Sequence, residues 1–564
     1  MRILSKKGDD LLLISEDEEI SKGDYVRVAD GRGRRSMLAQ VYEIEYFDVP
    51  GIEEDLLRDL LLDGVMISSS NPEYGSITAR VKDVRLIKCK VRGTLTDSGL
   101  SPEADWLPSR AAGKVERVAG AELLSMIRED GPSMRIGRTL DGHPLDLPLS
   151  ALDGSLTLIL GKKGSGKSHL AKLLVNGLVE NGAYVVVFDI NNEYAGITRN
   201  REGEPSPIAR KVYALEPGNS LRFNLRYLGR NVMADVLRNV LNLPATSTRE
   251  FLRIWSLLES SDRLTFRQLG EYIERWRAND MVRDALLSRY YSLASSRLIT
   301  DEHGFRFEDF FVDLESEGGG GALIVMLARA SALARRIVVE AVLSKLSELL
   351  HARVIPPIFI LAEEAHMYVR DTYWEDLITR MRHYGAFTIF VTNQPDALKD
   401  TVYRQADNLF LFNYTNEKDI EFIARYSATD AETLSGILPT LRRGRALLVG
   451  KATSWLPIVV DVDEADFQAL GQTRLFFREA RAAGKTRLSA PSPGRRFRQR
   501  MGRPSRAGIR QGDAGVRARP HLDRAISSSV DELLINSLSP AHPIVRRRTR
   551  RDAQGPEDPR GRGK

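Results

Sequence analysis

The stretch Leu156-Thr-Leu-Ile-Leu-Gly-Lys-Lys-Gly-Ser-Gly-Lys-Ser168 decides the fold. An apolar strand is followed directly by residues 161–168, which fit the pattern G-x-x-x-x-G-K-[S/T], and a helical stretch to Glu180 comes next. Glycines in such a loop let the backbone turn its N–H groups inward, and the start of the helix adds positive potential. This order of strand, loop and helix predicts an α/β domain that binds the phosphates of a nucleotide.

The phosphate loop also predicts roles for its own residues. Lys167 is expected to reach the β and γ phosphates, and Ser168 is expected to ligate Mg²⁺. A plain glycine-rich turn is the alternative, which the strand-loop-helix context disfavours. We predict that the nucleotide is bound by Gly161, Lys162, Lys163, Gly164, Ser165, Gly166, Lys167, Ser168 and His169.

Apolar strands alternate with helical segments through residues 154–470, which is typical of a mostly parallel sheet covered by helices. A charged, mostly helical insertion, at about residues 228–300, separates the second strand from the third. The helical spacing of its aromatic and leucine residues indicates a packed core rather than a cofactor pocket. The expected strands are residues 156–160, 184–188, 322–326, 358–361, 387–391, 446–449 and 457–462.

Paired carboxylates end one of these strands, in Pro357-Ile-Phe-Ile-Leu-Ala-Glu363-Glu364-Ala-His366. A carboxylate beside Mg²⁺ stays ionised and holds the metal through water, while a neighbour that faces the γ-phosphate can polarise the attacking water. We predict the metal-side role for Glu363 and the water-activating role for Glu364. Because strands often end in acidic residues, the motif by itself also permits a purely structural interpretation.

Polar residues follow two more strands. Asp189 follows residues 184–188, with Glu193 four residues later, and Gln394 lies just after residues 387–391. Ligands of open α/β sheets bind beyond the carboxyl ends of the strands, so these side chains are expected to face one crevice. We predict that Gln394 senses the γ-phosphate and that Asp189 or Glu193 orients water or the groups around it. Capping or turn roles are the alternatives.

Arg380 and Arg382 precede the strand at residues 387–391 and are expected on a loop. The planar fork of arginine suits the transition state of phosphoryl transfer, and such a group supplied by a neighbouring subunit is worth about 10³ to 10⁵ in rate. Either arginine is therefore a candidate for acting in trans, with a surface salt bridge as the alternative.

Residues 1–110 read as short strands. Ile87, Cys89 and Val91 alternate with basic residues, the period of a strand with one buried face. This pattern predicts a small antiparallel β-barrel at the N-terminus. Because Cys89 belongs to the apolar set, we expect it in the core rather than in a redox role.

Charge is distributed unevenly along the 564 residues, whose formal net charge is +6. Residues 481–564 carry 21 Lys and Arg against 7 Asp and Glu, so the rest of the chain is net acidic. The composition of this end, rich in Pro, Gly, Ser and Arg, predicts a C-terminal extension at residues 471–564 with a disordered basic tail. Non-specific affinity for polyanions is the simpler interpretation of the tail, and a specific binding element is the alternative.

Two absences narrow the class of protein. A single cysteine excludes an intramolecular disulfide framework and a zinc site built from several thiolates, and it favours a reducing compartment. The sequence contains neither an apolar stretch long enough to span a bilayer nor a signal-peptide-like start. We therefore expect a cytoplasmic protein without a membrane partner.

Taken in order, these motifs resemble the HerA family, which comprises hexameric DNA translocases and helicases of the HerA/FtsK superfamily found mainly in archaea. The resemblance covers about residues 1–470 and implies a RecA-like P-loop ATPase core at residues 154–470, after a HAS-type barrel and a connector at 111–153. It rests on Lys22-Gly-Asp-Tyr-Val-Arg-Val28, the phosphate loop, Phe188-Asp-Ile-Asn-Asn-Glu-Tyr194, Glu363-Glu-Ala-His366 and the stretch from Arg382-His-Tyr-Gly385 to Asn393-Gln-Pro395.

The resemblance implies ATP and Mg²⁺ as cofactors and an arginine that acts in trans. It also implies double-stranded DNA as substrate, a homo-hexameric ring, and a NurA-type nuclease as partner in resecting DNA ends for double-strand break repair, with the barrel as docking platform. The residues that match the family's functional positions are Lys167, Ser168, Asp189, Glu193, Glu363, Glu364, Arg382 and Gln394.

Two departures from the family pattern leave alternatives open. Lys162 and Lys163 stand where the family usually has small or hydroxyl residues, and Asp153-Gly-Ser155 stands where a basic residue commonly precedes the strand. A HerA/FtsK-type DNA pump with another partner therefore stays possible. A non-translocating scaffold gated by nucleotide is the alternative from a different class of protein.

Overall fold

The computed structural model describes residues 1–15, 19–30, 35–47, 84–97, 99–368, 381–468 and 470. All of them belong to one compact unit, Met1–Leu475. The predicted basic tail and Arg380 lie outside the described residues, as does most of the predicted C-terminal extension at 471–564. Within the described part of the chain, every helix is too short or too polar to cross a bilayer.

The N-terminal region is all-β, as predicted. The seven strands among its described residues are antiparallel and lie in the order β1-β2-β5-β4-β3-β7, with β6 paired to β5. The strands are β1 (Arg2–Lys7), β2 (Asp10–Ser15), β3 (Tyr25–Ala29), β4 (Ser36–Tyr46), β5 (Arg85–Thr96), β6 (Gly99–Ser101) and β7 (Lys114–Val118).

The predicted alternation in β5 is confirmed. Cys89 lies opposite Leu11 of β2, and Ile87 lies opposite Leu13; all four side chains are buried. Burial raises the pKa of the Cys89 thiol well above its usual range. The single cysteine is therefore a core residue, because its thiolate form is disfavoured and its sulfur is inaccessible.

A second sheet of eleven strands carries the phosphate loop. Its order is β12-β15-β11-β16-β17-β10-β18-β19-β20-β8-β9; the strands from β12 to β18 are parallel and the others antiparallel. The strands are β8 (Ser133–Arg138), β9 (Pro144–Pro148), β10 (Leu156–Leu160), β11 (Tyr184–Asp189), β12 (Val212–Leu215), β15 (Gly321–Met326), β16 (Ile358–Ala362), β17 (Ala386–Thr392), β18 (Asn408–Leu411), β19 (Arg445–Gly450) and β20 (Ile458–Val462).

This sheet confirms the predicted mostly parallel α/β core. Every expected strand between residues 156 and 462 is present, and β12 and β18 are additional parallel strands. The expected connector at 111–153 supplies strands to both sheets, since β7 completes the N-terminal sheet and β8 and β9 extend the ATPase sheet.

Alternate residues of the central strands enter two different cores. Leu158 and Leu160 of β10 pack in one core with helix α10, while Ile159 packs in the other core with helix α4. This is the pattern of a parallel sheet buried on both faces. The helices are α3 (Gly120–Ile127), α4 (Lys167–Glu180), α5 (Leu225–Asp235), α6 (Ala245–Ser260), α7 (Phe266–Arg275), α8 (Asp280–Ser296), α9 (Phe307–Ser316), α10 (Ala332–His351), α12 (Asp400–Arg404), α13 (Glu417–Tyr426) and α14 (Ala431–Ile437).

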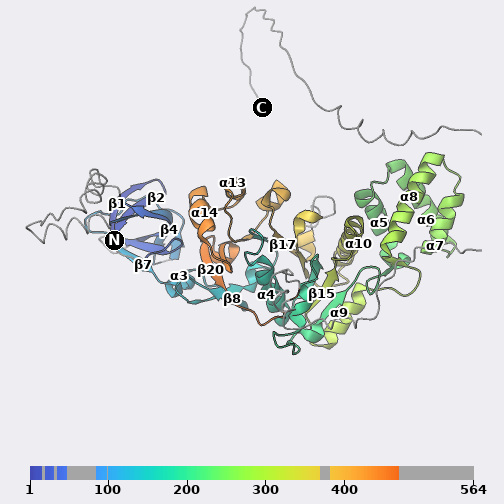
Figure 1. Ribbon diagram of the computed structural model, residues 1–564, viewed down its shortest axis with the longest axis horizontal. Coiled ribbons are helices and arrows are strands. Elements are labelled where there is room, and N and C mark those ends of the chain that lie inside the picture. Colours follow the sequence, from blue (N-terminus) through green and yellow to red (C-terminus); the bar gives the residue numbers. More distant parts are fainter. Residues whose placement is uncertain are drawn as a thin grey trace, which may run out of the picture. The chain divides into compact units, whose positions relative to one another are not determined.

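The predicted helical insertion consists of α5 to α8, which form one group beside α10 (Figure 1). Phe251 and Trp255 of α6 are fully buried, which confirms that the aromatic spacing marks a core. The two short strands β13 (Phe223–Asn224) and β14 (Ile299–Thr300) pair at the base of the insertion and hold its two ends together.

An ion pair joins the N-terminal sheet to the ATPase sheet's helices. Arg92 of β5 donates to Asp430, with 2.7 Å between Nη1 and Oδ2, and to the hydroxyl of Thr433 at 2.6 Å. Burial acts to raise the pKa of Asp430, but the Arg92 charge and the hydrogen bonds from Thr433 and Arg92 outweigh it and hold the pKa below its usual value. Asp430 thus stays ionised in a mostly buried position and depends on Arg92.

Arg92→Ala is expected to lower the thermal unfolding midpoint by several degrees Celsius, because it strands the Asp430 charge at a cost of about 3 kcal/mol. Arg283→Ala is a matched control, since Arg283 pairs with Asp280 on the surface of α8 and such pairs are worth about 0.5 kcal/mol. Circular dichroism melts of both variants test this. Equal, small shifts for the two variants would contradict it.

Candidate nucleotide site

The four strand ends that were predicted to share a crevice are neighbours in the sheet. Strands β11, β16, β17 and β10 lie side by side and parallel in that order. Their carboxyl ends therefore meet at one edge, which carries Asp189, Glu363, Thr392 and the phosphate loop, respectively. The predicted convergence follows from this strand order.

The phosphate loop has the backbone that its glycines allow. Gly164 and Gly166 have φ values of 79° and 123°, in the region that favours glycine. A Cβ atom on Gly161 would approach Cβ of Phe412 to 2.5 Å, so the chain can pass here only as glycine. Lys167 is buried, and its Nζ donates to the carbonyl oxygen of Lys162 at 3.1 Å. Burial lowers the pKa of Lys167, against the charges of Glu364 and Glu363.

Glu363 is the most constrained carboxylate of the site. Ser168 donates to its Oε1 at 2.6 Å, and the hydroxyl of Tyr194 donates to its Oε2 at 2.5 Å. The Tyr368 hydroxyl donates to the backbone oxygen of Glu363 at 2.8 Å. Burial raises the pKa of Glu363 to about 7, although the hydrogen bonds from Ser168 and Tyr194 lower it. The predicted Mg²⁺ ligands, Ser168 and Glu363, are therefore in direct contact.

Glu364 has a different environment from its neighbour. Its backbone is left-handed, with φ of 48°, which is a strained conformation for a residue with a side chain. Its Oε2 is buried, accepts no hydrogen bond from any residue that the structure describes, and lies 3.4 Å from Nδ1 of His366. Burial lowers the pKa of His366, which favours the neutral imidazole. An acceptor atom without a donor is what the predicted activation of water requires.

Asp189 and Glu193 are both engaged within the chain. Asp189 is fully buried, and its carboxylate accepts from the backbone N–H groups of Asn191 and Tyr194 at 3.2 and 2.8 Å. Burial raises the pKa of Asp189, opposed by these backbone hydrogen bonds. Glu193 pairs with Lys172 of α4 at 3.1 Å. Asp189 thus holds the loop that places Tyr194 on Glu363, and Glu193 lines a cavity over the phosphate loop.

Gln394 follows β17, the strand next to β10, and therefore lies beside the phosphate loop. Its backbone N–H donates to the hydroxyl of Thr392 at 3.1 Å, and its exposed side chain lines a cavity together with Lys162 and Lys163. The Thr392 hydroxyl lies 3.0 Å from Nδ1 of His366. The β17 end is thereby linked to the paired carboxylates, as a residue that senses the γ-phosphate would need to be.

Arg382 lies at the opposite edge of the sheet. Its Nη1 is 3.3 Å from Oδ2 of Asp407, the same oxygen that accepts from the backbone N–H of Leu156 at 2.9 Å. Leu156 begins β10 and Leu160 ends it, so strand geometry puts the phosphate loop about 13 Å from this point. Arg382 does not reach the nucleotide site of its own chain.

Several residues of the site were missed by sequence reasoning. A cavity of about 670 Å³ over the phosphate loop is lined by residues from distant segments, among them Arg201, Arg443 and Phe467. The segment 463–468 reaches this cavity because the backbone oxygen of Asp463 lies 2.9 Å from Nε2 of His169. None of these residues stands in a recognisable motif, so only the folded chain reveals them.

The donor set at Ser168 and Glu363 fits Mg²⁺. One hydroxyl and one carboxylate are few for a dedicated cage, and the described residues contain no group of three or more His, Cys, Asp or Glu side chains that could hold a metal ion. Mg²⁺ in phosphate sites typically takes its other ligands from phosphate oxygens and water. Bound Mg²⁺ would neutralise charge on the phosphates, and this site can hold it only together with a nucleotide.

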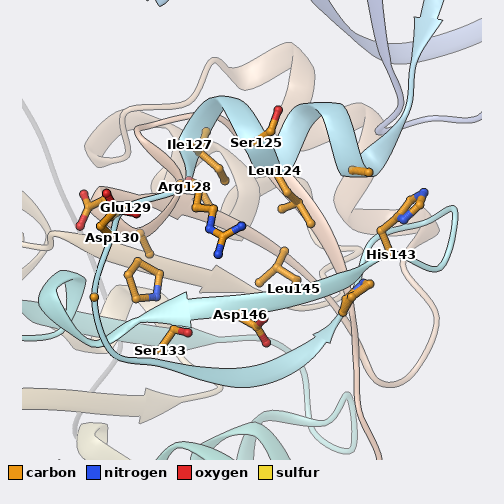
Figure 2. A pocket seen from close by; sticks show the side chains of 16 residues that line it. Leu124, Ser125, Ile127, Arg128, Glu129, Asp130, Ser133, His143, Leu145 and Asp146 are labelled. Atoms are coloured by element: carbon orange, nitrogen blue, oxygen red, sulfur yellow. The ribbon is translucent and has the colours of Figure 1, made fainter.

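A separate cavity of about 410 Å³ lies between α3 and the β8–β9 hairpin. Figure 2 shows Leu124 of α3 and Leu145 of β9 facing one another across it, with Arg128 at its side. None of the predicted site residues lines this cavity. It is therefore distinct from the nucleotide site.

Comparisons with known proteins show similarity to DNA repair helicases. Residues 134–346 match the family model described as "Helicase HerA, central domain". The DNA double-strand break repair helicase HerA of Sulfolobus acidocaldarius is 25% identical over 480 residues, which are 81% of this chain and 91% of that protein. The protein of the same name from Saccharolobus solfataricus is 24% identical over 411 residues, 68% of this chain and 78% of that one.

These similarities support a relationship to helicases of the HerA/FtsK type. Among solved structures, VirB4 of Thermoanaerobacter pseudethanolicus is similar with a TM-score of 0.45 and 18% identity, covering 60% of this chain and 98% of that one. The bacterial conjugative coupling protein TrwB is similar with a TM-score of 0.48 and 16% identity, covering 63% and 93%. The similarity to HerA helicases, together with the phosphate loop, identifies the chain as an ATP-hydrolysing P-loop enzyme.

The Glu363 carboxyl is expected to make the nucleotide-free protein less stable as pH rises. Its pKa is about 7 in the folded chain, against an ordinary value of 4.5. As pH rises, the unfolded chain therefore loses this proton first, and the free energy of unfolding falls between these two pH values. In Glu363→Gln this component is absent, and unfolding midpoints measured from about pH 5 to about pH 8 should fall less than in the wild type.

Glu259→Gln, at an exposed position near the end of α6, is the control and should follow the wild-type pH profile. Parallel pH profiles for Glu363→Gln and the wild type would contradict a raised pKa of the Glu363 carboxyl in the folded chain.

Proposed function

We propose that the chain is an ATP-driven motor that assembles as a hexameric ring and moves along double-stranded DNA. The observation that carries the proposal is the position of Arg382, at the sheet edge opposite its own phosphate loop. An arginine finger at that edge acts on the nucleotide of another copy. A closed ring gives every copy such a neighbour through one repeated interface.

The names of similar proteins support DNA as the proposed substrate. The similar proteins of Sulfolobus acidocaldarius and Saccharolobus solfataricus are described as DNA double-strand break repair helicases, and this chain aligns with most of the length of each. By the same relationship we propose action with a NurA-type nuclease in resecting DNA ends in the cytoplasm, with the N-terminal sheet as the docking platform. A related DNA pump with a different partner is the finer alternative.

The site residues have distinct parts in the proposed hydrolysis. The Glu364 carboxylate, whose Oε2 accepts no hydrogen bond, takes the proton of the attacking water. Lys167 and the loop N–H groups would hold the phosphates, Ser168 and Glu363 would hold Mg²⁺, and Gln394 would contact the γ-phosphate. Arg382 of an adjacent copy stabilises the charge of the transition state. Asp189 is a positioning residue, because it acts through the loop that carries Tyr194.

Linear duplex DNA is expected to raise ATP turnover of the purified protein, and Glu364→Gln is expected to lower turnover about 10² fold or more with or without DNA. The DNA effect should weaken as salt rises, because phosphate contacts release counterions. Phosphate release assays at several salt concentrations measure both effects. Turnover that is indifferent to DNA would favour the alternative of a nucleotide-gated scaffold that does not translocate.

Two inactive variants should restore activity to one another. Arg382→Ala keeps its phosphate loop and lacks the finger, whereas Lys167→Ala has the reverse defect, so mixed rings contain some complete sites. Turnover of the mixture is predicted to exceed the sum of the separate variants after subunit exchange.

A mixture of Lys167→Ala with Glu364→Gln is the control, because both defects fall in the same subunit's site and no arrangement of copies repairs it. A mixture of Arg382→Ala and Lys167→Ala that stays as inactive as this control would contradict the in-trans role of Arg382.

A further inference from the structure

The loop before β19 packs directly on the phosphate loop. The backbone N–H of Gly444 donates to the carbonyl oxygen of Ser165 at 2.9 Å. A Cβ atom on Gly166 would lie 3.3 Å from Cα of Gly444. Residues 442–444 are therefore fixed against the phosphate loop at Ser165 and Gly166. In the sequence they follow this loop by almost 280 residues.

Three arginines in this loop have different surroundings. Arg442 and Arg445 both pair with Oδ2 of Asp461, Arg445 through two nitrogens at 3.2 Å. Arg443, between them, makes no hydrogen bond or ion pair with any residue that the structure describes, and its side chain is exposed. It lines the nucleotide cavity together with Gly164, Gly166 and Lys167. Of the three arginines, Arg443 thus keeps an uncompensated positive charge beside the phosphate loop.

The other cations of this cavity differ in their availability. Lys172 is paired with Glu193, and Arg201 is paired with Glu464 at 3.0 Å. The Nζ atom of Lys167 is held by a carbonyl oxygen of the loop. Among the described residues, Lys163 and Arg443 have no acidic partner; Lys163 belongs to the phosphate-loop motif, whereas Arg443 comes from outside it. A guanidinium without an acidic partner, fixed beside a phosphate loop, is suited to bidentate contact with phosphate oxygens.

We propose that Arg443 contacts the polyphosphate chain of the nucleotide bound by its own subunit, as a positioning cation that the phosphate-loop motif does not include. The inference rests on the proposed nucleotide site and adds a residue to it. The substrate class is a nucleoside di- or triphosphate. Arg443 acts in cis, at the carboxyl edge of the parallel strands where its own phosphate loop lies, whereas Arg382 acts in trans from the opposite edge of the sheet.

Equilibrium titration with fluorescent ATP and ADP analogues tests the proposal on the full-length protein. Arg443→Ala is expected to weaken both by roughly tenfold or more, because a hydrogen bond between charged groups is lost. Competition by adenosine, which has no phosphate, should be unchanged, and Arg443→Lys should recover part of the affinity. Arg442→Ala is the matched control, since Asp461 keeps Arg445 as its partner.

Arg443→Gln, which keeps most of the side chain's length, serves if Arg443→Ala fails to fold, and the same loss is expected. Lys167→Ala reports on the nucleotide site itself. Wild-type affinity in the Arg443 variants, with binding lost in Lys167→Ala, would overturn the role of Arg443 and leave the nucleotide site intact. Wild-type affinity in all of them would overturn the nucleotide site as well.

Discussion

The buried carboxylate of Glu363 is the interaction on which the rest of the site depends. Its two oxygens accept from Ser168, at the start of α4, and from Tyr194, on the loop after β11, while the chain itself continues from β16. Three segments are thereby joined through one group. Because burial raises its pKa to about 7, this carboxylate is costly to keep charged without a cation, and a bound metal ion would relieve that cost.

The same sheet separates the two halves of the proposed chemistry. Phosphate-binding and water-activating groups lie at the carboxyl edge of the parallel strands, whereas Arg382 lies at the edge where β10 begins. A rigid sheet cannot bring the two edges together, so a complete site requires Arg382 from a second copy of the chain. The Arg92–Asp430 ion pair ties the N-terminal sheet to the ATPase body, so any partner bound there would be linked mechanically to the site.

Sequence reasoning predicted what local patterns encode. The phosphate loop, the strand just before Glu363 and the buried face containing Cys89 are all set by neighbouring residues, and the structure places them as expected. The short strand β18 was not predicted, because its few residues form a strand only by pairing with β10 and β19, which are distant in the sequence. The position of Arg443 was not predicted for a related reason, since only a contact between distant segments, the hydrogen bond from Gly444 to Ser165, brings its loop to the phosphate loop.

Displacement of a triplex-forming oligonucleotide from duplex DNA tests translocation itself, because it detects movement along the duplex without requiring strand separation. The wild-type protein is expected to displace the oligonucleotide only with ATP, and Glu364→Gln and Arg382→Ala are expected not to displace it. Vigorous DNA-stimulated ATP hydrolysis by the wild type that leaves the triplex in place would contradict a translocating motor.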